Sequence, residues 1–200
     1  MKKLSQVIWG IGLSWIGLAA MAATPTGTTS PQLLLKSIAV HPACIARFLP
    51  TNPDGTVSDS LVNLAMCQKI NQNKKVTINS QGFATYNTTY GGMFGYQLVG
   101  QTSSGSYVLR SFNSGGGSGV FDNLFVISVK PDTLVTQSIG SPTSEQTLVY
   151  LKLERVISVG DRCLSGIATV SVQGDTINLT QYQGQTAVDC SKTRNITINM

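Results

Sequence analysis

The chain has 200 residues, of which 42% are hydrophobic and only 12% are charged. This balance excludes disorder of the whole chain, which needs few apolar residues and a high net charge. The 14 Lys plus Arg are scattered along the sequence, whereas proteins that bind nucleic acid gather their cationic side chains on one face. We therefore expect no nucleic-acid partner.

Residues 1–23 have the three parts of a secretory signal peptide. Lys2 and Lys3 precede an apolar run over 7–18, and the small residues of 19–23 follow it as an A-x-A-like cleavage site. The apolar run is shorter than the roughly 20 residues of a transmembrane helix. We therefore predict an exported protein, periplasmic or extracellular, with no membrane span after cleavage. Without the two leader lysines, 12 cationic residues face 9 acidic ones, a formal charge of +3.

The mature chain begins with a polar segment and continues into apolar sequence. Residues 24–31 are predicted to form a flexible arm, and residues 32–200 a single β-rich domain. A short strand or helical turn is expected over 33–40. Apolar side chains at i, i+3, i+4 and i+7 then predict a helix over 61–70, capped by Ser58 or Asp59.

The four cysteines all follow the predicted cleavage site. An even number behind a signal peptide indicates disulfides, and three connectivities exist. We favour Cys44–Cys67 with Cys163–Cys190, because each pair closes a loop of moderate length; the nested pairing of Cys44 with Cys190 stays open. A zinc site needs closely spaced ligand pairs, which the sequence lacks. No metal and no cofactor are therefore expected.

From residue 76 onward, the pattern becomes that of strands. Alternating or β-branched runs, separated by turn residues, predict strands over 94–99, 106–112, 120–129, 147–159, 167–172, 176–182 and 196–200. In the run over 147–159, Val149, Leu151 and Leu153 share one face. Successive strands joined by short turns favour a mainly β protein, with one antiparallel β-sandwich or barrel-like domain and one short helix near its N-terminus.

Residues suited to catalysis are few. His41 is the single histidine, and its neighbours Pro42 and Cys44 favour a structural role. A pair of carboxylates is the remaining route to hydrolysis. Asp122 and Asp161 are the two acidic residues that are least clearly bound into turns, and they define a hydrolase alternative.

A glycine-rich loop is the most distinctive feature of the sequence. The segment 113–123 contains four glycines, and a second glycine cluster with aromatic residues covers 90–96. Glycine-rich backbone allows close approach of a partner, and function favours loops on a rigid scaffold. If both clusters meet at one end of the sheet, they form a recognition rim. Its predicted members are Ser114, Gly116, Ser118, Phe121, Asp122, Phe94 and Tyr96.

These features favour an exported, soluble binding protein without enzymatic activity, whose partner is a protein or another component of the cell envelope. Two alternatives come from other classes. One is a small secreted hydrolase that uses carboxylates such as Asp122 and Asp161. The other is a structural subunit of a surface fibre, in which the β-prone end Asn195 to Met200 adds a strand to a neighbour.

Overall fold

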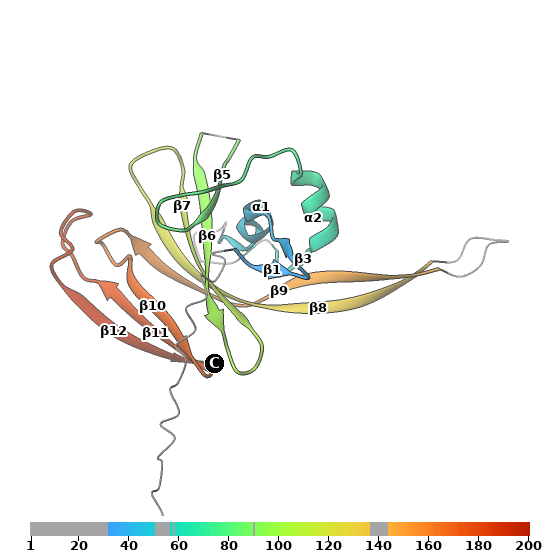
Figure 1. Ribbon diagram of the computed structural model, residues 1–200. Coiled ribbons are helices and arrows are strands. Elements are labelled where there is room, and N and C mark those ends of the chain that lie inside the picture. The colour runs from blue at the N-terminus through green and yellow to red at the C-terminus, as the bar shows by residue number, and fades with distance from the viewer. Residues whose placement is uncertain (1–31, 51–56, 58, 90, 137–143) are drawn as a thin grey trace, which may run out of the picture.

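The computed structural model describes residues 32–50, 57, 59–89, 91–136 and 144–200 (Figure 1). Three antiparallel sheets of seven, three and two strands make the protein mainly β, as the sequence predicted. The predicted signal peptide and the flexible arm over 24–31 lie outside the described residues.

The seven-stranded sheet is a meander with one added edge strand. From β4 to β9, each strand pairs with the next along the chain, and β3 pairs with β9 at the far edge, giving the order β3-β9-β8-β7-β6-β5-β4. Its strands are β3 (Leu61–Asn63), β4 (Thr77–Ile78), β5 (Ala84–Asn87), β6 (Met93–Gln101), β7 (Tyr107–Ser114), β8 (Phe121–Thr136) and β9 (Ser144–Asp161).

Short N-terminal elements cover one face of this sheet (Figure 1). They are β1 (Leu34–Leu35), β2 (Ile38–Ala39), α1 (Pro42–Ile45), the 3-10 helix η1 (Ala46–Phe48) and α2 (Leu64–Asn71). Their apolar side chains form one core with the sheet. Phe48 meets Phe125 of β8 edge to face, with ring centroids 6.3 Å apart.

A three-stranded sheet covers part of the other face. Its strands are β10 (Ile167–Gln173), β11 (Thr176–Tyr182) and β12 (Thr193–Asn199). Ile167, Ile177 and Leu179 pack there with residues of β7 and β8. Successive residues of a strand point to opposite faces. Since both faces of β8 are covered at this point, the run 124–127 is wholly buried, which explains its unbroken hydrophobicity.

Both favoured disulfides are present. Cys44–Cys67 links α1 to α2, and Cys163–Cys190 links the segment after β9 to the segment before β12. No free cysteine remains. The prediction of two local bridges is confirmed.

The predicted helix over 61–70 begins three residues later than expected. Leu61–Asn63 instead pairs with Lys152–Tyr150 of β9, so tertiary pairing overrides the helical spacing. The cap is Asn63, whose side chain accepts a hydrogen bond from the Met66 N–H at 2.9 Å, and Asp59 binds Arg47 instead. The helix α1 was not predicted.

Candidate functional site

The two glycine clusters do meet at one end of the seven-stranded sheet. A side chain at Gly116 would lie 3.3 Å from the carbonyl oxygen of Gly91, and one at Gly92 would collide with the carbonyl oxygen of Ser114. The loop between β7 and β8 therefore packs backbone to backbone against the turn before β6. Glycine is needed here because a Cβ would separate the two segments.

This close approach predicts a selective effect of adding one methyl group. Gly92→Ala is expected to destabilise the protein by about 1–3 kcal/mol through overpacking. Gly117→Ala in the same loop meets open space and should change stability little. Urea unfolding of both variants measures the difference, and equal stabilities would contradict the packing of these two segments.

The structure corrects the aromatic part of the predicted rim. Phe94 and Tyr96 are buried in the core beneath the N-terminal elements, and the Tyr96 hydroxyl donates a hydrogen bond to the carbonyl oxygen of Val40 at 2.7 Å. These two rings therefore stabilise the fold and cannot contact a partner. Ser118 and Gly116 are exposed, as is half of Phe121, while Ser114 is partly exposed.

Asp122, another predicted rim residue, is buried and links the seven-stranded sheet to the three-stranded sheet. Its Oδ2 accepts hydrogen bonds from the Ile167 N–H at 2.8 Å and from Arg110 Nη2 at 3.4 Å. Burial raises the pKa of Asp122, although Arg110 and the Ile167 amide oppose the rise. Its side chain faces a cleft of about 690 Å³, which Arg110 and Tyr182 also line.

Asp161, the second carboxylate of the hydrolase alternative, also accepts a hydrogen bond from a backbone N–H. Its Oδ1 accepts from the Val120 N–H at 3.0 Å and from Arg162 Nε at 2.9 Å. The Val120 hydrogen bond, followed by Arg162, lowers the pKa of Asp161. Asp122 and Asp161 thus have pKa values shifted in opposite directions, as in an acid–base pair. Each carboxylate, however, already accepts a backbone N–H.

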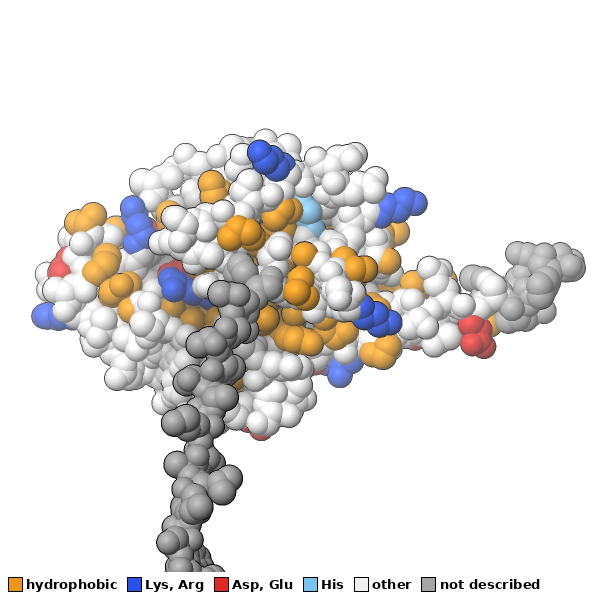
Figure 2. Space-filling view, in the orientation of Figure 1, with side chains coloured by type: hydrophobic (Ala, Val, Ile, Leu, Met, Phe, Trp, Pro, Cys, Tyr) orange, Lys and Arg blue, Asp and Glu red, His pale blue; other side chains and the backbone are white. Residues whose placement is uncertain are grey.

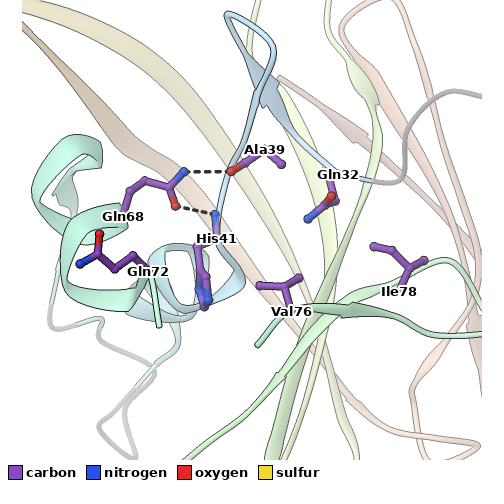
Figure 3. A pocket seen from close by; sticks show the side chains of 7 residues that line it. All are labelled: Gln32, Ala39, His41, Gln68, Gln72, Val76 and Ile78. Atoms are coloured by element: carbon purple, nitrogen blue, oxygen red, sulfur yellow. Dashed lines mark hydrogen bonds between the residues drawn. The ribbon is translucent and has the colours of Figure 1, made fainter. Parts of the chain in front are cut away.

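His41 lies beside a pocket of about 460 Å³ between α2 and the strands near β4 (Figure 3). Its Nδ1 accepts a hydrogen bond from the Ala43 N–H at 3.0 Å and so caps α1. Its Nε2 lies 3.2 Å from the carbonyl oxygen of Lys74, which can only accept, so Nε2 carries the proton. Gln68 bridges the His41 N–H and the Ala39 carbonyl (Figure 3). These contacts fix a neutral ring in a structural position.

The neutral ring makes stability depend on pH. Burial lowers the pKa of His41 below its ordinary 6.5, so the unfolded chain binds the proton first as the pH falls. The stabilising contribution is complete above pH 6.5 and is lost as the pH falls toward the folded-state pKa. Melting temperature should therefore drop between pH 7.5 and pH 5.5. His41→Asn, which keeps a capping oxygen but does not titrate, should show a smaller drop; an equal drop would contradict this role.

The most prominent feature that the sequence did not predict is a long hairpin that extends beyond the sheet (Figure 1). β8 and β9 pair from Phe121↔Asp161 to Thr136↔Ser144, but β7 covers β8 only as far as Ile127. Residues 128–136 and 144–149 extend past β7 and are called here the projecting hairpin. Within the described ranges its outer part, 131–136 with 144–149, is two-stranded, because β3 still pairs with residues 150–152 opposite 128–130. The six residues 131–136 span about 20 Å at about 3.3 Å per residue.

An apolar groove lies where the projecting hairpin leaves the body. It has a volume of about 560 Å³ and is called here the root groove. The β1–β2 hairpin, α2, and the hairpin face that carries Val129 and Val149 form its walls. Leu34 and Ile38 on its rim are 46% and 61% exposed. Figure 2 shows apolar side chains gathered around this part of the surface.

Apolar residues continue outward along the projecting hairpin. Leu134 and Val135 are 44% and 56% exposed. Among the described residues, no third strand pairs with 145–149 or with 128–136. Pro131 lacks an N–H and so impairs pairing along the outer edge of β8. The outer edge of β9 has no proline and is open to an added strand.

No protein-family model, curated protein or solved structure matches the chain. Within the described ranges, no group of three or more His, Cys, Asp or Glu side chains is arranged to hold a metal ion. No helix in the same part of the chain has the length and apolarity needed to cross a membrane. The candidate site is the projecting hairpin with its root groove, on the geometry described above.

Proposed function

We propose that the protein is an exported, non-enzymatic interaction protein that binds a protein of the cell envelope through its projecting hairpin. The observation that carries this proposal is the continuity of an exposed apolar hairpin with an apolar groove at its root. Two disulfides are typical of oxidising compartments. The leader over 1–23 supports export to the periplasm or beyond.

An isolated two-stranded hairpin is only marginally stable in water. Among the described residues, no layer covers the outer part of the projecting hairpin, so a partner that covers Leu134 and Val135 lowers the free energy. Full burial of one such side chain contributes about 1.5–3 kcal/mol. The open edge of β9 offers main-chain hydrogen bonds to an added strand. A protein partner satisfies both features together.

The accessible remainder of the predicted rim is a second candidate contact. Ser114, Gly116, Ser118 and Phe121 lie at the β7–β8 loop, and the exposed half of Phe121 is the largest apolar surface there. This surface is the weaker candidate, because the cleft of about 690 Å³ beside it, although partly lined by Phe112 and Val120, also contains Arg110, Asp122 and Arg162.

The fibre-subunit alternative rests on β12. This strand already pairs with β11 from Thr176↔Asn199 to Tyr182↔Thr193, and it lies at the edge of its sheet. Strand addition would therefore use its outer edge, because the inner edge is occupied. Oligomers that persist after the outer edge of β12 is blocked by Thr197→Pro would contradict this alternative.

Site-specific photo-crosslinking tests the proposed function. A photoreactive residue is placed at Val135 on the projecting hairpin, at Phe121 by the glycine loop, or at Val188, which is exposed but distant from both in sequence. After irradiation in the native envelope, we expect discrete protein adducts from position 135 and none from position 188. Adducts from position 121 without any from 135 would transfer the function to the glycine loop. Absence of adducts at both positions would overturn binding by either surface.

A further inference from the structure

The root groove carries a cationic side chain at its rim, and the outer end of the projecting hairpin carries an acidic one, so the two surfaces complement each other in charge. We propose that the groove of one copy of this chain receives the hairpin end of a second copy. This inference rests on the proposed function and names the partner.

The groove presents an apolar floor with one charge. Leu34, Ile38, Leu64, Val129 and Val149 are among its apolar lining residues, and Lys36 is the one charged residue among the described residues that line it. Lys36 occupies the turn between β1 and β2, at the exposed rim. A complementary ligand therefore carries apolar side chains flanked by a negative charge.

The outer end of the hairpin has this composition. Val135 and Glu145 are direct cross-strand partners, so their side chains share one face of the hairpin. By strand alternation, this is the face that also carries Val129 and Pro131, and farther in it lines the groove. Both side chains are exposed. One face of the hairpin therefore lines the groove at its root and carries the exposed side chains of Val135 and Glu145 at its outer end.

The hairpin cannot fill its own groove. Val135 lies four residues beyond Pro131 on the same extended strand, which places it about 13 Å farther out at about 3.3 Å per residue. Pro131 itself lines the groove. Covering the groove with the outer end therefore requires a second copy. If both copies exchange hairpins, a closed dimer forms; if the contact is one-way, it propagates from copy to copy.

Charge reversal provides a sharp test on the purified mature chain, residues 24–200. Glu145→Lys and Lys36→Glu are each expected to weaken self-association about tenfold or more in sedimentation velocity, which a like-charge contact produces. The double variant, with both charges exchanged, should restore most of the affinity. Asp132→Lys makes the same change in charge as Glu145→Lys but falls on the opposite hairpin face, because Asp132 pairs with Leu148. This control should associate like the unmodified chain.

Mixing two defective variants tests the geometry of the contact. Val135→Lys places a charge on the hairpin end, and Ile38→Lys places one on the rim of the groove. Both positions are exposed, so the fold should remain intact. Circular dichroism and melting temperature will verify this. Each variant is expected to be monomeric alone. Their mixture retains one intact hairpin end and one intact groove, so it should form a complex of one copy of each.

The outcomes separate this inference from the proposed function. A purified chain that stays monomeric up to about 200 µM, well above the micromolar range of ordinary contacts, overturns docking between copies. So does association that neither charge reversal affects. If position 135 then still crosslinks to a different protein in the envelope, the proposed function stands with another partner. Failure of all crosslinking from position 135 overturns both.

Discussion

Shortening the projecting hairpin is expected to abolish association while leaving the fold intact. Thr133 and Thr147 are cross-strand partners, so a short glycine-containing loop can join them in place of residues 134–146. The deletion removes Leu134, Val135 and Glu145 but keeps the residues that line the root groove. We expect association to weaken at least 100-fold, which corresponds to about 2.7 kcal/mol.

The same variant should keep its stability, because the side chains removed from the described strands are largely exposed. A melting temperature within about 4 °C of the unmodified chain, equivalent to about 1 kcal/mol for a protein of this size, would show an intact fold. The double variant Leu134→Ser with Val135→Ser keeps the full length of the hairpin and removes only its apolar side chains. It should also weaken association. Undiminished association of the shortened chain would exclude the hairpin as the contact element.

Removing the Cys44–Cys67 bridge is expected to cause a large loss of stability. The bridge spans 23 positions, and the chain-entropy estimate for such a loop is about 3 kcal/mol. Cys44 is also buried in the core beneath the seven-stranded sheet. For Cys44→Ala with Cys67→Ala, the melting temperature should fall by about 6–12 °C.

Comparison with the second bridge gives this prediction a control. Cys163–Cys190 spans 27 positions, so chain entropy alone predicts nearly the same loss. Cys163→Ala with Cys190→Ala should therefore destabilise the protein to a similar extent. If removal of a bridge leaves the unfolding transition unchanged, that bridge does not stabilise the protein. That result would contradict the expectation that this part of the fold needs an oxidising compartment for its stability.

Much of the β structure could be predicted because local chemistry determines it. Alternation in 94–99 and the turn Gly174-Asp175 define β6 and the β10–β11 hairpin, while cysteine spacing favoured the two local bridges. The full length of the β8–β9 hairpin could not be predicted in this way. Pro131 and the polar residues 144–147 resemble loop sequence, but pairing between β8 and β9 satisfies their backbone.

The candidate site was harder to predict than the fold. The root groove combines Tyr107 with residues from 34–38, 64–68, 129–131 and 147–149, and no local pattern connects such distant segments. Phe94 and Tyr96 illustrate a related difficulty. Alternation correctly places them on one face of a strand, but it does not reveal that α1 and η1 cover that face. An aromatic pair beside glycines can therefore belong to the core.

Hydrogen–deuterium exchange tests most directly whether the projecting hairpin is the surface that the partner covers. Exchange is compared between the dilute purified chain and the same chain in its associated state. We predict slower exchange in peptides covering 128–136 and 144–149 on association, with peptides over 115–121 unchanged. Protection confined to 115–121, with the hairpin exchanging equally in both states, would contradict the account.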